Sequence, residues 1–255
     1  MAEDETEGDP SLRDTLAAQG IAPDGRVSET IGKDVTVVAA SVTTPEPSKL
    51  PSVRIADQGD ADFVVRSELG RGGMGTVVLA RERSLGRDVA IKRASSGSRT
   101  ALDLLLREAT VTGRLEHPNI VPVHAVVRDD GEPAVVMKRV TGMSWEALIE
   151  RGDASLERHL QVFQQVCNAV AFAHDRGVIH RDIKPANVMV GEFGEVYLLD
   201  WGIAGPRDDE GTGQMRGTPQ YMAPEMVSGR SDERSDVFLL GASLHEAVTC
   251  RPRYE

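Results

Sequence analysis

The first residues whose spacing could do chemistry are Gly70, Gly72 and Gly75, a GxGxxG pattern that is followed by Val77. Because glycine has no Cβ, the backbone N–H groups of such a loop can come close to phosphate oxygens. Glycine-rich hairpins without a ligand are also common, so this pattern alone is weak evidence for a phosphate site. The glycines stand between two strand-like runs and not at a strand-to-helix turn, which disfavours a Rossmann dinucleotide fold.

A lysine, Lys92, ends the apolar run Val89-Ala90-Ile91 fifteen residues after Val77. One interpretation is an edge lysine whose ammonium group reaches water past its apolar stem. The other is a cation that faces nucleotide phosphates and is held by a carboxylate from the next helix. Glu108, which has apolar neighbours on that helix, is the candidate partner.

The most specific pattern is His180-Arg181-Asp182-Ile183-Lys184-Pro185-Ala186-Asn187, with Asp200-Trp201-Gly202 beginning thirteen residues after Asn187. The run from Gly217 to Glu225, GTPQYMAPE, follows. With the glycine loop, Lys92 and Glu108, these residues match the protein kinase signature in order and approximate spacing. From about residue 61 to residue 255 the chain therefore resembles a eukaryotic-type Ser/Thr protein kinase of the bacterial branch.

The resemblance implies a catalytic role for four polar residues. Asp182 would take or orient the proton of the substrate hydroxyl, and Lys184 would neutralise the γ-phosphate. Asn187 and Asp200 would hold Mg²⁺, because their oxygens are hard ligands suited to a hard cation. An active kinase is thus expected, with ATP and Mg²⁺ as its cofactors.

The nucleotide site that the resemblance implies comprises Leu69, Gly70, Gly72, Gly75, Val77, Ala90, Lys92, Glu108, Met137, Lys138 and Val140. Lys92, fixed by an ion pair with Glu108, would bind the α- and β-phosphates. Apolar side chains of the first strands would enclose the adenine ring. Met137 would be the gatekeeper, and the backbone from Lys138 to Val140 would bond the adenine edge.

Two residues narrow the expected substrate. Lys184, two residues after Asp182, and Thr218, in the GTPQY run, match the Ser/Thr pattern and not the Tyr pattern of the family. We therefore expect protein substrates that are phosphorylated on serine or threonine. A small-molecule phosphotransferase of related fold is disfavoured, because such enzymes lack the GTPxYMAPE segment that positions a peptide.

Regulation is expected through the activation loop. Arg181, directly before Asp182, implies control by phosphorylation, because an arginine at that place can pair with a phosphate. Thr212 is the only hydroxyl residue between Ile203 and Gly217, and a second copy of the chain could phosphorylate it. Its acidic neighbours could instead hold the loop open. Thr212 and Thr218 are the candidate regulatory residues.

Trp201 departs from the family, in which phenylalanine is much commoner between the Asp and the Gly. The resemblance places its ring between the lobes near His180, where an indole needs a partner for its N–H group. We expect a changed balance between loop positions with the magnesium chemistry intact. The segment Ser235 to Val248 resembles the central helix of the large lobe, and Asp236 is expected to brace the catalytic loop.

The elements that position these residues follow from hydrophobic spacing. Runs at 63–70, 75–83, 87–94, 120–127 and 133–140 predict strands, and runs at 99–115, 156–173 and 235–248 predict helices. A mainly antiparallel sheet with one helix thus precedes a mainly helical half. The expected fold is α+β and bilobal, with a small lobe at 61–137, a hinge at 138–142 and a partial large lobe at 143–255.

Composition limits the class of protein. The 255 residues carry a net charge of −11, which argues against nucleic acid and anionic membranes as partners. No apolar run approaches the ~18 residues of a membrane span, and the acidic start is unlike a signal peptide. Cys167 and Cys250 form no disulfide framework, which favours a reduced, cytoplasmic protein.

The two ends of the chain differ from the middle. Residues 1–60 hold 12 acidic and 5 basic residues, so we expect a disordered extension. At the other end the family continues past the central helix, so we expect a piece of a longer protein. The arginine that pairs with Glu225 in the family would then be absent, at a cost of ~3–5 kcal/mol for a buried charge. A catalytically impaired, kinase-like scaffold is the alternative function.

Overall fold

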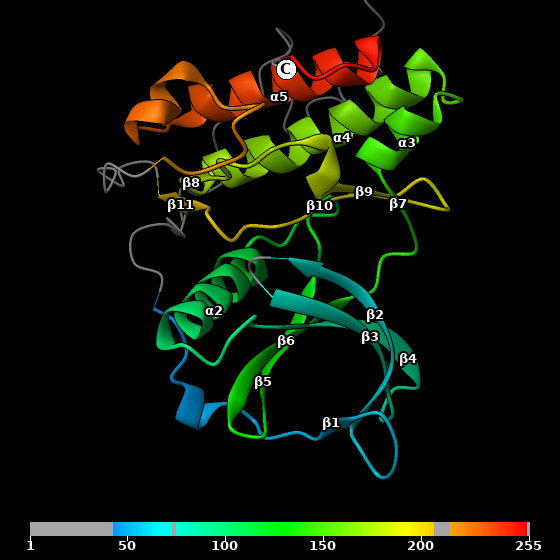
Figure 1. Ribbon diagram of the computed structural model, residues 1–255, viewed down its shortest axis with the longest axis vertical. Helices are drawn as coiled ribbons and strands as arrows, with labels where there is room; N and C mark the ends of the chain where they lie inside the picture. Colours follow the sequence, from blue (N-terminus) through cyan, green and yellow to red (C-terminus); the bar gives the residue numbers. More distant parts are fainter. Residues whose placement is uncertain (1–42, 73–74, 207–214, 254–255) are drawn as a thin grey trace, which may run out of the picture. The chain divides into compact units, whose positions relative to one another are not determined.

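The computed structural model describes residues 43–72, 75–206 and 215–253 (Figure 1). A six-stranded sheet forms the small lobe, with the strands in the order β1-β2-β3-β4-β6-β5. The strands are β1 (Ile55–Ala56), β2 (Phe63–Gly72), β3 (Gly75–Glu82), β4 (Arg87–Arg93), β5 (Val123–Asp129) and β6 (Glu132–Lys138). Neighbours pair antiparallel, except that β1 is parallel to β2. Asp130 and Gly131 both have positive φ, which suits the tight turn between β5 and β6.

One long helix accompanies this sheet. Helix α2 (Arg99–Arg114) begins after Ser98, whose hydroxyl accepts a hydrogen bond from the Ala101 N–H at 3.3 Å. Its residues Leu105 and Ala109 are buried against Val135 of β6. Because Glu108 lies on the same side of the helix, this packing directs Glu108 toward the sheet.

The large lobe is mainly helical. It contains β7 (Gly142–Ser144), α3 (Trp145–Arg151), α4 (Leu156–Asp175), β8 (Val178–Ile179), η2 (Pro185–Asn187), β9 (Val188–Gly191), β10 (Val196–Leu198), β11 (Gly205–Pro206), η3 (Pro224–Ser228) and α5 (Glu233–Thr249). Strands β10, β9 and β7 form one small sheet, and β11 pairs with β8. Figure 1 shows α3, α4 and α5 together on the far side of these short strands from the six-stranded sheet.

One continuous core stabilises the large lobe. Residues of α4, including Val162, Val166 and Ala169, are buried against Leu239 of α5 and the apolar residues of the short strands. Asp232 caps α5 with a reciprocal capping box in which Ser235 is the partner. The catalytic loop (residues 180–187) is anchored in this core by Ile183, which is fully buried.

The segment before β2 is ordered against the sheet from Leu50 onward, although residues 1–60 were expected to be disordered. The Val53 N–H donates to the Arg128 carbonyl at 2.9 Å, while Ile55 pairs with Phe63. The Ile55 N–H also donates to the Asp129 carboxylate at 3.0 Å. The segment therefore contacts β5 at one edge of the sheet and forms β1, beside β2, at the other edge. The prediction of disorder for residues 1–42 lies outside the described residues and stays a prediction.

The α+β, two-lobed architecture is the one expected from hydrophobic spacing. The strand expected at 120–127 begins only at Val123, after Pro122, and Ile120 instead bridges to Leu198 of β10. The central helix extends slightly beyond the expected range on both sides. Within the described part of the chain, none of the helices combines the length and the apolar character that crossing a membrane requires.

Candidate active site

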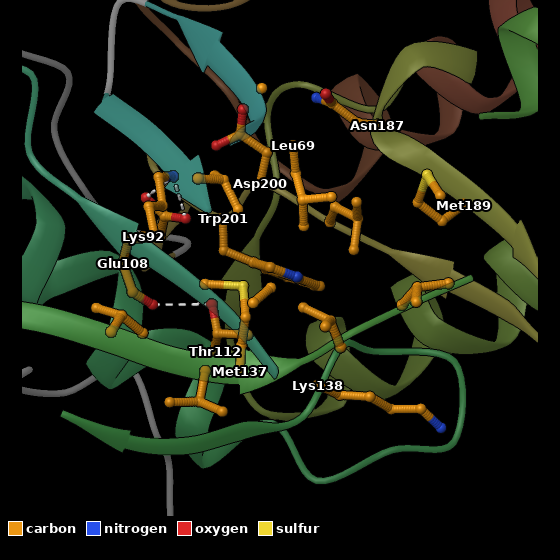
Figure 2. A pocket seen from close by; sticks show the side chains of 18 of the residues that line it. Leu69, Lys92, Glu108, Thr112, Met137, Lys138, Asn187, Met189, Asp200 and Trp201 are labelled. Atoms are coloured by element: carbon orange, nitrogen blue, oxygen red, sulfur yellow. Dashed lines mark hydrogen bonds and ion pairs between the residues drawn. The ribbon is translucent and has the colours of Figure 1, made fainter. Parts of the chain in front are cut away.

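A cavity of about 590 Å³ contains most of the nucleotide site expected from the sequence (Figure 2). Its lining includes the expected residues Leu69, Gly70, Val77, Ala90, Lys92, Glu108, Met137, Lys138, Val140, Asn187 and Asp200. Gly72 and Gly75 do not line it. Gly75 has a φ of +147°, and a Cβ there would lie 2.0 Å from the Arg93 carbonyl oxygen, so the hairpin requires glycine at this position.

Half of the residues that line this cavity were not predicted from the sequence. The additional lining residues are Leu105, Ala109, Thr112, Val121, Val123, Val135, Gly142, Ala186, Met189, Leu199 and Trp201. Three of these residues, all on α2, could have been predicted from their helical spacing. Leu105, Ala109 and Thr112 lie on the same helical face as Glu108, so placing Glu108 in the site also places them there.

Lys92 and Glu108 form the ion pair that the sequence suggested. Lys92 Nζ lies 2.6 Å from Glu108 Oε1 and 2.7 Å from Oε2, and the side chains are only 12% and 13% exposed. Burial raises the pKa of the Glu108 carboxyl, and the Lys92 ammonium acts in the opposite direction. The interpretation of Lys92 as an edge lysine that points to water is therefore wrong. Glu108 therefore holds the ammonium group of Lys92 at the wall of the cavity.

The catalytic loop joins Asp182, Lys184 and Thr218 in one hydrogen-bonded cluster. Lys184 Nζ donates to Asp182 Oδ2 at 2.9 Å and to Thr218 Oγ1 at 2.6 Å. Thr218 Oγ1 in turn donates to Asp182 Oδ1 at 2.7 Å. Both carboxylate oxygens of Asp182 are thus oriented, and Thr218, which was expected to be regulatory, lies directly beside the expected base.

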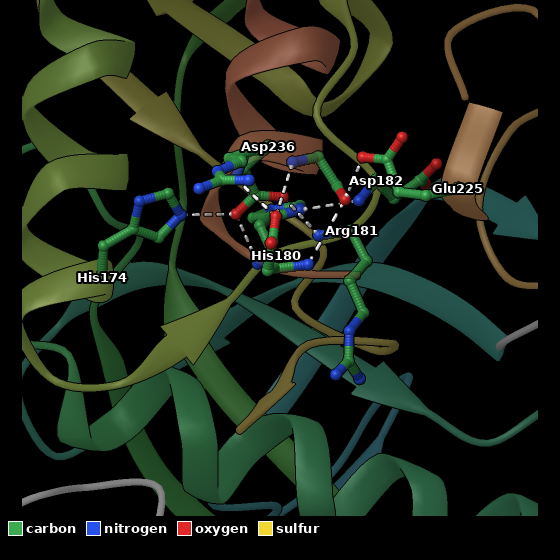
Figure 3. Close-up of polar contacts among 9 residues, drawn as sticks. His174, His180, Arg181, Asp182, Glu225 and Asp236 are labelled. Carbon is green, nitrogen blue, oxygen red and sulfur yellow. Dashed lines mark hydrogen bonds and ion pairs between the residues drawn. The ribbon is translucent and has the colours of Figure 1, made fainter. Parts of the chain in front are cut away.

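Asp236 of α5 supports this loop (Figure 3). Its two carboxylate oxygens accept the N–H groups of His180 and Arg181, each at 2.8 Å, and His174 Nε2 also lies 2.8 Å from Oδ2. Asp236 is fully buried, and Arg181 has a φ of +73°, which a non-glycine residue rarely adopts. The expected bracing role of Asp236 is confirmed, since these bonds hold the strained backbone directly before Asp182.

Asn187 and Asp200 each offer an oxygen atom of the kind that suits a cation. The Asn187 amide nitrogen donates to the Asp182 carbonyl at 2.8 Å and to its carboxylate at 3.0 Å, which leaves the amide oxygen as the atom available to a metal ion. Asp200 Oδ1 is buried and has no hydrogen-bond partner among the described residues. A buried carboxylate oxygen without a donor is costly unless a cation neutralises it. The two oxygens therefore fit a divalent ion.

Trp201 packs where the resemblance placed it. It is 1% exposed, and its ring lies 4.5 Å from the His180 ring at an interplanar angle of 58°. The expectation of a hydrogen-bond partner for the indole is wrong, because Nε1 has none among the described residues. The large ring contributes buried apolar packing, and its unpaired N–H donor is an energetic cost.

Glu225 also differs from the expectation. Its carboxylate was expected to lack a partner, but Ser235 Oγ donates to Glu225 Oε1 at 2.6 Å. The residue is only partly buried, so the large penalty of an isolated buried charge does not apply. The other expected regulatory residue, Thr212, lies outside the described residues.

The comparisons with known proteins agree with this geometry. A protein-family model described as protein kinase domain matches residues 63–255. The chain belongs to the protein kinase family. The match begins at the first residue of β2 and includes every residue of the catalytic cluster. Members of this family use ATP and a divalent metal ion.

Three relatives of this kinase come from bacteria. It is 33% identical over 222 residues to the serine/threonine-protein kinase PknD of Chlamydia trachomatis serovar D, a match that covers 71% of this chain and 24% of that protein. It is 36% identical over 207 residues to the probable serine/threonine-protein kinase CE0033 of Corynebacterium efficiens, covering 76% and 31%. For the serine/threonine-protein kinase PknB of Mycobacterium tuberculosis the identity is 39% over 204 residues, covering 73% and 32%. The chain thus matches about a quarter to a third of the length of these relatives.

Proposed function

We propose that the chain is the catalytic domain of a Ser/Thr protein kinase, which transfers the γ-phosphate of ATP to hydroxyl groups of proteins with Mg²⁺ as the metal ion. The observation that carries this proposal is the cluster of Asp182, Lys184 and Thr218, which Asn187 links to the cavity. Lys92, Glu108 and Asp200 line the same cavity. We therefore assign to one site a base, two cations and a carboxylate for the metal ion.

The apolar part of the cavity suits the adenine ring. Leu69, Val77 and Ala90 come from the small lobe, and Met189 comes from β9 of the large lobe, so the ring would lie between two apolar layers. The Lys138 N–H already donates to the Pro122 carbonyl at 2.9 Å. The carbonyl of Lys138 and the N–H of Val140 are the groups that we assign to the adenine edge.

The polar part of the cavity suits the phosphates. Lys92 would bind the α- and β-phosphates, with Glu108 keeping its ammonium group in place. Asn187 and Asp200 would hold the magnesium ion, which supplies positive charge to the phosphate oxygens when it is bound. Because Asn187 also donates to the Asp182 carboxylate, one side chain would link the metal site to the base.

The transfer itself requires a base and a cation in the catalytic loop. Asp182 would accept the proton of the incoming serine or threonine hydroxyl as its oxygen attacks the γ-phosphorus atom. Lys184, 2.9 Å from that carboxylate, would neutralise the γ-phosphate oxygens as the bond to the leaving ADP breaks. Thr218 would keep both groups in one orientation.

Regulation by phosphorylation of Thr212 in trans, by a second copy of the chain, fits the charges near the activation segment. Arg181 Nη2 donates to the Pro206 carbonyl at 3.0 Å. A Cβ placed on Gly205 would lie 2.6 Å from Arg181 Nη1 and 3.1 Å from Arg107 Nη2. Two guanidinium groups thus lie beside Gly205, and they could pair with a phosphate on Thr212.

The cysteines support a reducing compartment. Cys167 and Cys250 are both free thiols. Since the reaction requires ATP, we place this domain in the cytoplasm.

Phosphoamino-acid analysis tests the substrate class. The chain is incubated with Mg·ATP and a generic protein, beside the Lys92→Met variant as a control for contaminating kinases. We expect phosphoserine and phosphothreonine from the parent and a strongly reduced yield from the variant. Mainly phosphotyrosine would contradict the Ser/Thr assignment. Binding of Mg·ATP without any transfer would instead support the scaffold function.

A further inference from the structure

Two consecutive cations of the hinge, Lys138 and Arg139, bond to different lobes. Lys138 Nζ donates to the Tyr197 hydroxyl at 2.5 Å and lies 4.8 Å from the centre of the Tyr197 ring. Tyr197 belongs to β10 of the large lobe and is almost fully buried. Figure 2 shows that the Lys138 side chain leads away from the cavity, so its ammonium group is not available to a nucleotide.

Arg139 makes the opposite connection. Its Nη1 donates to Asp88 Oδ2 at 2.8 Å, and Asp88 belongs to β4 of the small lobe. Asp88 Oδ1 also accepts Arg81 Nη1 of β3 at 3.1 Å. The Asp88 carboxylate thus binds Arg81 through one oxygen and Arg139 through the other, so the two ion pairs can be removed separately.

The two partner residues lie close in sequence to groups of the proposed nucleotide site. Tyr197 lies three residues before Asp200, and Asp88 lies four residues before Lys92. We therefore expect a change at Asp88 to displace Lys92 along β4, and a change at Tyr197 to displace Asp200, which follows β10 by two residues. The hinge is thus connected to the phosphate-binding lysine on one side and to the metal-binding carboxylate on the other.

We propose that Lys138 and Arg139 are positioning residues that clamp the two lobes to the hinge and so set the separation of Lys92 and Asp200. This inference deepens the proposed function, because it assumes that these two groups face one bound nucleotide. Neither side chain touches the nucleotide in this arrangement. Each acts through its partner strand.

The two arms of the clamp differ in their exposure. The Arg139 and Asp88 side chains are 33% and 35% exposed, whereas Tyr197 is 7% exposed. Salt screens partly exposed ion pairs more than buried contacts. The Arg139 arm is therefore the one that weakens at high ionic strength, and the Lys138 arm persists.

The test measures the separation of the lobes directly. Spin labels are attached to cysteines at Leu85 and Phe193, which are 66% and 95% exposed on the β3–β4 and β9–β10 turns. Cys167 and Cys250 are replaced by Ala and Ser in all proteins. Pulsed electron resonance then gives the distance distribution for the parent and for the double variant Tyr197→Phe/Arg139→Gln. The matched control is Arg81→Gln, which removes an ion pair to the same Asp88 within the small lobe.

We expect one narrow distribution for the parent and for Arg81→Gln, and a broader one for the double variant. The dissociation constant of a magnesium-bound, non-hydrolysable ATP analogue should rise about three- to tenfold in the double variant and not in Arg81→Gln, because only the clamped arrangement binds well. Lys138→Met, which removes the cation of the first arm, should raise this constant as well. An unchanged distribution in the double variant, or an equal broadening in Arg81→Gln, would overturn the proposal. If the parent fails to bind the analogue, the nucleotide site is refuted, while the distance measurement still decides on the clamp.

Discussion

Thr218 donates its hydroxyl to Asp182 Oδ1 at 2.7 Å and accepts Lys184 Nζ at 2.6 Å. The activation segment thus closes directly on the catalytic loop, although 36 residues separate Thr218 from Asp182 in the chain. The hydroxyl bridges the base and the cation of the proposed reaction. A side chain in this position controls the orientation of both groups.

Replacement of Thr218 should therefore affect turnover. Thr218→Ala should lower kcat about 10- to 100-fold, since it removes two hydrogen bonds that orient the reacting groups. KM for ATP should stay within about twofold, because Thr218 does not line the nucleotide cavity. Steady-state kinetics measure both. Thr218→Ser keeps the hydroxyl and should retain most of the activity. Equal losses in the two variants would contradict the bridging role.

The Lys92–Glu108 pair should be sensitive to the loss of one partner. Glu108→Ala should lower the free energy of unfolding by about 3 kcal/mol, because it leaves the Lys92 charge uncompensated in a mostly buried place. The double variant Lys92→Met/Glu108→Leu should recover part of this stability and still fail to bind Mg·ATP. Urea unfolding and calorimetric titration measure the two quantities. A double variant that is less stable than Glu108→Ala would argue against an uncompensated charge.

Trp201 should tolerate a smaller aromatic ring. Trp201→Phe removes an N–H donor that has no partner among the described residues, which offsets part of the lost apolar contact. We expect the free energy of unfolding to fall by less than about 2 kcal/mol and phosphate transfer to continue. Trp201→Ala is the comparison, with an expected loss of about 3–5 kcal/mol from the cavity it creates. Complete loss of turnover in Trp201→Phe would show that the indole has a further role.

Stability should decrease in mild acid, and His159 should be one cause. Trp145 Nε1 donates to His159 Nδ1 at 3.0 Å, and burial lowers the pKa of His159 below 6.5. In the unfolded chain His159 binds a proton near pH 6.5, whereas in the folded chain it does so only at a lower pH. The stability that the neutral side chain contributes is therefore fully present above pH 6.5 and is lost as the pH falls below that value. Burial also lowers the pKa of His117 and His124, so their contributions have the same sign.

Urea unfolding between pH 7.5 and pH 5 measures this dependence. His159→Gln should flatten the slope below pH 6.5, whereas His245→Gln, on the exposed surface of α5, should leave it unchanged. A slope that is the same in the parent and in His159→Gln would contradict the assignment.

The sequence predicted the parts of the site that depend on local patterns. The placement of Lys92 followed from an apolar strand that ends in a lysine, and Glu108 from a helix whose apolar face points to the sheet. Asp182, Asn187 and Asp200 followed from the resemblance to the kinase family, whose motifs their segments match. Such motifs are short and continuous in the sequence, so one sequence is enough to find them.

The parts that the sequence did not predict depend on contacts between distant segments. The hydrogen bond between Val53 and Arg128 is an example, since Val53 belongs to residues 1–60, whose acidic composition predicted disorder. Ser235 as the partner of Glu225, and Tyr197 as the partner of Lys138, likewise require the tertiary fold. Side-chain partners across elements depend on packing, and periodicity carries no information about them.

The proposed phosphate transfer depends on Asp182, and the Asp182→Asn variant is its decisive test. The measurement is the rate of ³²P transfer from Mg·ATP to a generic protein, at equal occupancy of the nucleotide site as checked by titration. We expect a rate at least about 100-fold below that of the parent, with unchanged ATP affinity. Equal rates in the parent and in Asp182→Asn would contradict it.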